Sequence, residues 1–121
     1  MPRPILEESR IHPALRESIA GLHAQTLREV QDAVAKNAVV VVGMATNPYC
    51  RRARRALESA GIAHRYLEYG SYLSGWRQRN AIKMWTGWPT LPMVFVKGTL
   101  VGGCDDLQRL MASGEIQRLL A

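Results

Sequence analysis

The sequence predicts one α/β domain in which helices flank a four-stranded mixed sheet, preceded by a helical extension. Three patterns predict this fold: helical spacing of apolar residues between Ile11 and Lys36, an unbroken apolar run from Ala38 to Val42 that contains four consecutive valines, and a hairpin pattern from Met93 to Val101. The chain has 121 residues, 47% of them apolar and 21% charged. This length and composition are sufficient to bury an ordinary core without a metal or disulfide framework.

The segment from Ile11 to Lys36 is expected to form one or two amphipathic helices. Its apolar residues recur at mostly three- and four-residue steps, which is the spacing of one helix face. They are Leu15, Ile19, Leu22, Leu27, Val30 and Val34. Because these helices precede the main fold, residues 1–37 are expected to form an N-terminal extension and residues 38–121 the main domain.

A βαβ unit is expected next. Four consecutive valines that end at Gly43 predict a strand covered on both faces. Asn47 and Pro48 then suit the cap and first position of a helix that stops at Gly61. The segment from His64 to Tyr69 is the second strand, so the connection should be right-handed.

The second half of the chain supplies the remaining elements. A helix is expected from Ser74 to Trp85, and the strands Met93–Val96 and Thr99–Val101 should form a hairpin around a Lys-Gly turn. A helix that opens near Asp105 and a last helical segment that ends at Leu120 complete the chain. The resulting order of helix, β-α-β, helix, β-β and helix is the thioredoxin arrangement.

The composition also limits the partners. The net charge of +6 favours acidic partners, and four arginines cluster at positions 51, 52, 54 and 55. This cluster can be a solvated helix face, an electrostatic aid to a nearby anion or thiolate, or a nucleic-acid patch. Nucleic acid is not expected, because no ladder of aromatic residues accompanies the arginines.

The cytoplasm is the expected location. The longest apolar run, Ala38 to Ala45, is too short to span a bilayer, and no basic start followed by an apolar signal region opens the sequence. A membrane is therefore not an expected partner. No metal site is expected either. The two cysteines, Cys50 and Cys104, do not form a secreted disulfide framework, and they can be packed, free or redox-active.

Three stretches resemble the glutaredoxin family in order and spacing. The downstream half looks most like the monothiol branch, from Arg79 to Glu115, whereas the first turn looks like the dithiol branch. The stretches are Asn47-Pro48-Tyr49-Cys50, Trp88-Pro89-Thr90-Leu91-Pro92 and Gly102-Gly103-Cys104-Asp105-Asp106. The resemblance implies a thioredoxin-like (glutaredoxin) fold and glutathione as substrate or ligand.

The active-site turn of Asn47, Pro48 and Tyr49 departs from the family pattern. The family's nucleophile is a cysteine thiolate at a helix N-terminus, and here Asn47 occupies that position. Asparagine forms no disulfide, but it is an excellent helix cap. Cys50 matches the resolving cysteine of the dithiol pattern and is the candidate catalytic thiol. The alternative is an inert buried thiol, because free cysteine is often buried.

The resemblance also implies the glutathione-binding residues. Pro92 resembles the family's cis-proline, next to Thr90 and to Leu91, whose backbone would pair with the peptide. Gly103, Cys104 and Asp105 resemble the turn that holds the γ-glutamyl end. Arg79 aligns with an arginine that contacts the glycine carboxylate, although a surface arginine is an equal alternative. Met44 stands where the family usually has a lysine, which would weaken glutathione binding.

Three functions remain open at this stage. The first is a glutathione-linked thiol–disulfide oxidoreductase with an atypical active site, acting in electron transfer and redox homeostasis on glutathione or glutathionylated proteins. The second is a catalytically degenerate module that binds glutathione or a peptide. The third is a protein-interaction scaffold. An iron–sulfur cluster is not expected, because Asn47 lacks the ligating sulfur, and a monomer or weak homodimer is expected.

Overall fold

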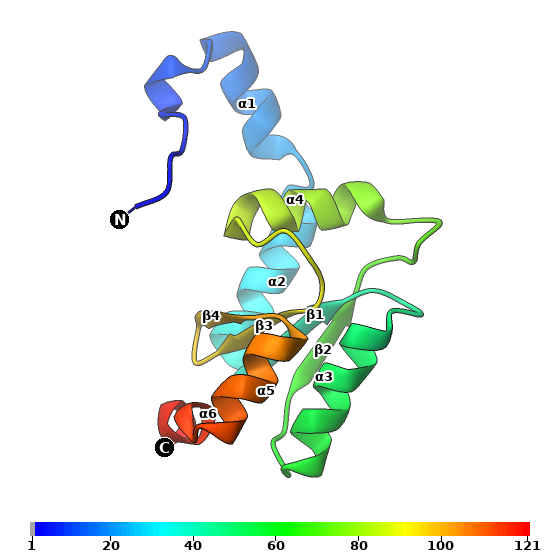
Figure 1. Cartoon of the computed structure of the whole chain (residues 1–121). Helices are drawn as coiled ribbons and strands as arrows, with labels where there is room; N and C mark the ends of the chain where they lie inside the picture. Colours follow the sequence, from blue (N-terminus) through cyan, green and yellow to red (C-terminus); the bar gives the residue numbers. More distant parts are fainter. Residues whose placement is uncertain (1) are drawn as a thin grey trace.

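The computed structural model describes residues 2–121 and contains one mixed sheet with helices on both faces (Figure 1). The strands are β1 (Val39–Gly43), β2 (Arg65–Glu68), β3 (Met93–Val96) and β4 (Thr99–Gly102). Their order in the sheet is β2-β1-β3-β4. β1 is parallel to β2, while the β1–β3 and β3–β4 pairs are antiparallel. The predicted mixed sheet and its hairpin are confirmed.

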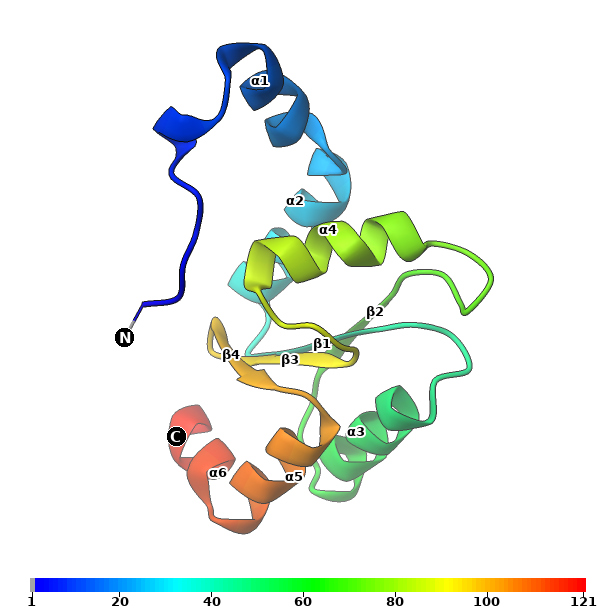
Figure 2. The same ribbon diagram turned by 45° about the horizontal axis from the view of Figure 1, so that its top comes forward.

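Helices cover the two faces of the sheet separately. α2 (Ala24–Lys36) and α4 (Trp76–Thr86) lie on one face, and α3 (Pro48–Ser59), α5 (Cys104–Ala112) and α6 (Glu115–Leu120) lie on the other (Figure 2). All five residues of β1 are buried. Alternate valines of this strand enter opposite cores because side chains of a strand alternate between its faces. The unbroken valine run is therefore explained by a strand that is buried on both faces of the sheet.

The predicted N-terminal extension is divided by the structure. The 3₁₀ turn η1 (Glu8–Arg10) and α1 (Pro13–Gly21) contain no buried residue and stand away from the sheet in both views (Figures 1 and 2). In contrast, Val30 of α2 is fully buried in the core that includes Val40 and Ile82. The boundary predicted at residue 37 is thus misplaced, since α2 belongs to the main domain. Among residues 2–121, no helix is long and apolar enough to cross a membrane.

The largest difference from the predicted elements precedes α4. The helix begins at Trp76 rather than at Ser74, because residues 70–75 form a tight turn. Gly70 and Gly75 both have positive φ angles, of 68° and 72°, which favour glycine. A Cβ on Gly75 would lie 2.8 Å from Gly70 Cα, so the two glycines also allow the ends of the turn to approach. The same turn carries the exposed side chains of Tyr72 and Leu73.

Candidate functional site

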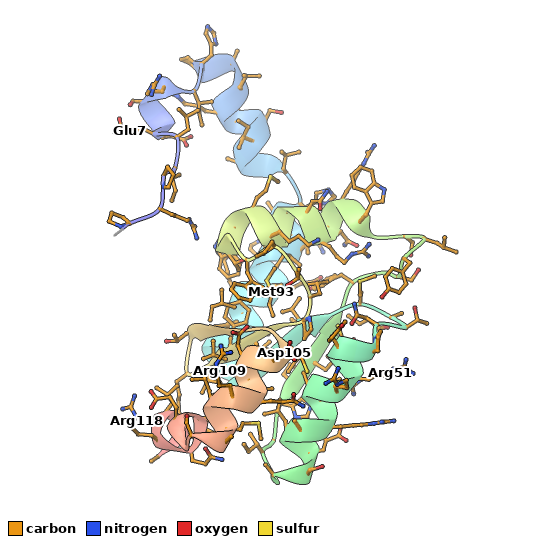
Figure 3. All side chains as sticks on the ribbon, viewed as in Figure 1. Glu7, Arg51, Met93, Asp105, Arg109 and Arg118 are labelled. Carbon is orange, nitrogen blue, oxygen red and sulfur yellow. The ribbon has the colours of Figure 1, made fainter. Side chains whose placement is uncertain are left out.

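The three motifs meet in a cleft of about 480 Å³ beside the N-termini of α3 and α5. The cleft is lined by the start of α3, the loop before β3, the start of α5 and parts of α4 and its preceding turn. The lining residues are Met44, Asn47, Tyr49, Tyr72, Lys83, Trp88, Pro89, Thr90, Leu91, Pro92, Gly103, Cys104, Asp105 and Asp106. Figure 3 shows Asp105 on α5 and Arg51 on α3, the two helices that begin at this cleft. A volume of this size suits a small molecule such as a tripeptide.

Asn47 occupies the helix cap at the centre of the active-site turn. Its Oδ1 accepts hydrogen bonds from Tyr49 N at 2.9 Å and Cys50 N at 3.1 Å. The backbone amides that would stabilise a thiolate at this position are therefore used by a neutral amide oxygen. Asn47 is 9% exposed and lines the cleft. It holds the start of α3 in place and supplies no sulfur.

Cys50, the predicted catalytic residue, lies outside the cleft lining. It is 1% exposed and packs in the core with Met44 and Tyr69. A Cβ on Gly43 would lie 2.9 Å from Cys50 Sγ, so β1 closely covers the thiol. Burial raises the pKa of Cys50, and a backbone hydrogen bond from Met44 only partly opposes this effect. These features are those of a packed thiol rather than of an activated nucleophile.

The arginine cluster of α3 is only partly a solvated face. Arg51, Arg52 and Arg55 are exposed. The Arg54 guanidinium instead lies 3.9 Å from the centre of the Tyr66 ring, and its Nε is buried without a hydrogen-bond partner among the described residues. Cation–π contact replaces water around this charge. The Tyr66 hydroxyl in turn donates to Glu68 Oε1 at 2.9 Å, so Arg54 is part of a structural cluster.

The loop before β3 supplies the second wall of the cleft. The Leu91–Pro92 peptide bond is cis, which confirms the prediction made for Pro92. Thr90, Leu91 and Pro92 all line the cleft. Thr90 is exposed, whereas Leu91 and Pro92 are buried. The loop thus presents an exposed threonine and two buried neighbours to the cleft.

The third wall is the N-terminus of α5. Asp106 Oδ2 accepts a hydrogen bond from Gly103 N at 3.0 Å, and its Oδ1 pairs with Arg109 at 2.6 Å. Asp106 therefore caps the helix. Asp105 is exposed and has no ion-pair partner among residues 2–121. The first amides of the helix and the free Asp105 carboxylate can together receive an amino-acid head group, because one attracts a carboxylate and the other an ammonium.

Cys104 is the thiol that lines the cleft. It is the first residue of α5 and is buried against Leu107 and Ile116. Burial raises the pKa of Cys104, while the nearby Arg52 lowers it. Cys50 and Cys104 are both free cysteines. The only sulfhydryl in the cleft lining therefore comes from α5 rather than from α3.

Arg79 is the predicted ligand-binding residue that the structure does not bring to the cleft. It is 7% exposed, and its Nη1 donates to Tyr69 O at 3.0 Å and to Ser74 O at 2.6 Å. The alternative of a surface arginine is wrong, because the side chain is buried. Its guanidinium satisfies carbonyl groups of the turn before α4.

The cleft cation is instead Lys83, which the sequence analysis did not identify. Lys83 follows Arg79 by four residues on α4, and it lines the same cleft as Asp105. The four-residue spacing was the available signal, since such residues share a helix face. Tyr72 is a second cleft residue that was not among the predicted site residues. Nothing in its local pattern distinguishes it from an ordinary loop tyrosine.

These features define a thioredoxin-like α/β protein with a cleft between the cis-proline loop and two helix N-termini. The glutaredoxin family model matches residues 39–101 of this chain. A glutaredoxin-like protein of Dictyostelium discoideum is 48% identical over 98 residues, which cover 81% of this chain and 80% of that protein. A glutaredoxin of Vernicia fordii is 34% identical over 92 residues, covering 76% and 88% of the two chains.

Solved structures give the same result. The crystal structure of the buckwheat glutaredoxin–glutathione complex superposes with a TM-score of 0.71 at 28% identity, covering 80% of this chain and 88% of that chain. Glutaredoxin 2 of Chlamydomonas reinhardtii in its oxidised form has a TM-score of 0.67 at 32% identity, covering 80% and 92%. This chain belongs to the glutaredoxin family.

Proposed function

We propose that this protein binds the glutathionyl group of glutathione or of glutathionylated proteins in the cleft, as part of glutathione-linked thiol–disulfide chemistry with altered activity. The observation that carries the proposal is the convergence of Leu91–Pro92, Gly103 and Asp105 on one cleft. They come from two segments of the chain, the loop before β3 and the start of α5. Each matches one part of an extended tripeptide with an amino-acid head group.

The binding half of the site is complete in chemical terms. The backbone beside cis-Pro92 offers a peptide-like edge, and the α5 N-terminus with Asp105 offers complementary charges to the γ-glutamyl head group. Lys83 supplies the positive charge for the glycine carboxylate in place of Arg79. It also compensates for Met44, which stands where the family usually has lysine.

The reactive half of the site is altered. Thiol–disulfide exchange needs a thiolate that reaches the sulfur of the bound glutathionyl group. Asn47 cannot provide one, and Cys50 is buried outside the cleft with a raised pKa. Cys50 serves as the nucleophile only if the start of α3 moves. We therefore expect slow or absent turnover of a small glutathione mixed disulfide by the parent protein.

The second candidate function is glutathione binding without turnover. The specific observation in its favour is that Asn47 stably caps α3 at the nucleophile position while both cysteines are buried. A [2Fe–2S] cluster does not fit the active-site turn, because Asn47 brings no sulfur to the position of the family's ligating cysteine.

The deciding experiment combines a titration with a turnover assay. Glutathione is titrated into labelled protein, and shifts at Leu91, Gly103 and Asp105 are expected. No shift at millimolar glutathione would refute the proposal. Reduction of a small glutathione mixed disulfide is then compared for the parent, Cys50→Ser and Asn47→Cys. Activity lost in Cys50→Ser means that this thiol reacts, whereas an inactive parent rescued by Asn47→Cys means a binding module.

The proposed setting is a reducing compartment such as the cytoplasm. Support comes from the two free cysteines, which a glutathione-rich compartment keeps reduced. A monomer or weak homodimer is the proposed oligomeric state. Size-exclusion chromatography with light scattering over a range of concentrations tests this part of the proposal.

A further inference from the structure

The turn between β2 and α4 presents apolar side chains to solvent beside the cleft. Leu73 is 96% exposed and Tyr72 is 64% exposed. Tyr72 also lines the cleft, so the turn is part of its margin. Burying a leucine stabilises a protein by about 1.5–3 kcal/mol. Leu73 contributes almost none of this to folding, which makes its place at the tip of the turn informative.

The turn is firmly built. Ser71 N donates to Ser74 O at 3.0 Å, and Ser74 N donates to Ser71 O at 3.3 Å. Leu73 N donates to Ser71 Oγ at 3.2 Å. The two main-chain bonds form a small bridge that holds Tyr72 and Leu73 at its tip. The exposure of Leu73 is therefore fixed by hydrogen bonds on both sides of it.

Buried groups hold the base of the same turn. Arg79 donates to both Tyr69 O and Ser74 O, and the close approach of Gly70 and Gly75 joins the two ends. Burying a guanidinium is energetically unfavourable, and here its hydrogen bonds to two carbonyl groups offset that cost. Its effect is to fix the position of an exposed leucine next to a ligand cleft.

Two further exposed aromatic residues come from the elements on either side. Tyr49, at the start of α3, and Trp76, at the start of α4, are each about half exposed, and Tyr49 also lines the cleft. Figure 1 and Figure 2 both show the β2–α4 turn beside the connection that enters α3. We call Tyr49, Tyr72, Leu73 and Trp76 the docking rim. Exposed apolar clusters of this kind mark interaction surfaces, and aromatic residues dominate their binding energy.

Arginine side chains flank the docking rim. The Arg52 guanidinium lies 5.5 Å from the centre of the Tyr49 ring, and that of Arg77 lies 5.1 Å from Trp76. Arg51 is exposed on the same turn of α3. None of these three arginines has an ion-pair partner in residues 2–121. The charges complement carboxylates, in line with the net charge of +6.

We infer that the docking rim binds an acidic polypeptide segment that places an apolar side chain against Leu73, and that this segment belongs to the protein whose glutathionyl group occupies the cleft. Only one part of this inference rests on the proposed function, namely that the glutathionyl group occupies the cleft. A polypeptide fits better than a nucleic acid, since the most exposed member of the rim is an aliphatic leucine, which offers no face for base stacking.

Short synthetic peptides provide the test. Each carries a central cysteine joined to glutathione by a non-exchanging thioether, and the flanking residues are glutamate with leucine, glutamate with serine, or lysine with leucine. The 121-residue chain should bind the glutamate–leucine peptide about tenfold more tightly than glutathione alone, and it should bind the other two peptides less tightly than the glutamate–leucine peptide. Equal affinity for all three peptides and glutathione would overturn the inference.

Variants outside the cleft lining locate the effect. Leu73→Ser and Arg77→Glu should each remove most of the gain for the glutamate–leucine peptide while leaving the affinity for glutathione unchanged. Leu15→Ser on α1 and Arg28→Glu on α2 are matched exposed controls and should retain the gain. If Leu73→Ser keeps the full gain in affinity for the glutamate–leucine peptide, the inference is contradicted. Displacement of this peptide by a single-stranded oligonucleotide would contradict it as well.

The proposed function and the docking rim can fail separately. A matching peptide with S-methylcysteine, which lacks glutathione, binds only through the rim. If glutathione does not bind but this peptide binds in a Leu73-dependent way, the cleft assignment is wrong and the rim is correct. If glutathione binds but the flanking residues have no effect, the rim is wrong and the cleft is correct.

Discussion

Replacing Arg79 with methionine separates a structural role from a ligand-binding role. The substitution keeps the length and apolar stem of the side chain but removes the donor to Tyr69 O and Ser74 O. Two buried carbonyl groups then lose a charged partner, and each such loss destabilises by about 1–3 kcal/mol. Removing the charge also removes the unfavourable burial of a guanidinium. We expect the free energy of unfolding to fall by about 2–3 kcal/mol.

This value converts into a thermal shift. A chain of 121 residues unfolds with an entropy of about 0.25 kcal/mol/K near 60 °C, so the expected decrease in Tm is about 8–12 °C. Urea unfolding measures the free energy directly, and calorimetry measures Tm. Hydrogen exchange should be faster at the amides of Ser71, Leu73 and Ser74, because the base of the turn has lost its anchor.

The neighbouring Arg77 gives a matched control. Arg77 is exposed and its guanidinium lies over the Trp76 ring, so Arg77→Met should change the free energy of unfolding by less than about 0.5 kcal/mol. An Arg79→Met protein as stable as the parent, but with weakened glutathione binding, would refute the reasoning. That result would assign Arg79 to the ligand, whereas we expect Lys83→Met to weaken glutathione binding.

Three other predictions follow from the site. Asn47→Ala should lower the free energy of unfolding by about 1 kcal/mol, because the cap of α3 is lost, whereas Asn47→Asp keeps the acceptor and stability; urea unfolding distinguishes the two, and equal losses would contradict the cap. Gly43→Ala should destabilise by about 1–3 kcal/mol, because the new Cβ would lie 2.9 Å from Cys50 Sγ. Adding Cys50→Ala should restore part of that loss, and strictly additive effects would contradict the steric explanation. Burial raises the pKa of Cys50, Tyr66 and Tyr69, so these groups stay protonated in the folded state while the unfolded state ionises at ordinary pKa values. The stability present at neutral pH should therefore decrease as the pH rises above about 9, and a urea midpoint that stays constant from pH 8 to 10.5 would contradict this.

The sequence alone predicted most of the sheet and the helices around it. The strand Met93–Val96 has the predicted bounds, and Asn47 caps α3 with Pro48 in its first turn. Patterns of this kind are local, because alternation, valine runs and capping residues act on their immediate neighbours. The resemblance between three short motifs and one family was also visible in the sequence, and it placed the cis-proline at Pro92.

The predicted site residues divide into those set by local pattern and those set by tertiary packing. Residues next to an element boundary, such as Thr90, Gly103 and Asp105, line the cleft as expected. Cys50 and Arg79 were predicted from the resemblance to the family, but burial decides what a thiol or a guanidinium can contact. The position of a residue in a helix does not show which other segment will pack against it. Both side chains are buried in the structure.

The sequence by itself determined the order of elements, the family and the absence of a sulfur at position 47. The tertiary structure decided which thiol and which cation reach the cleft, Cys104 and Lys83, and where the main domain begins. It also decided that Leu73 stands in solvent at the tip of a fixed turn. The reason is physical: local pattern follows from neighbours along the chain, whereas burial and electrostatic environment follow from segments that meet only after folding.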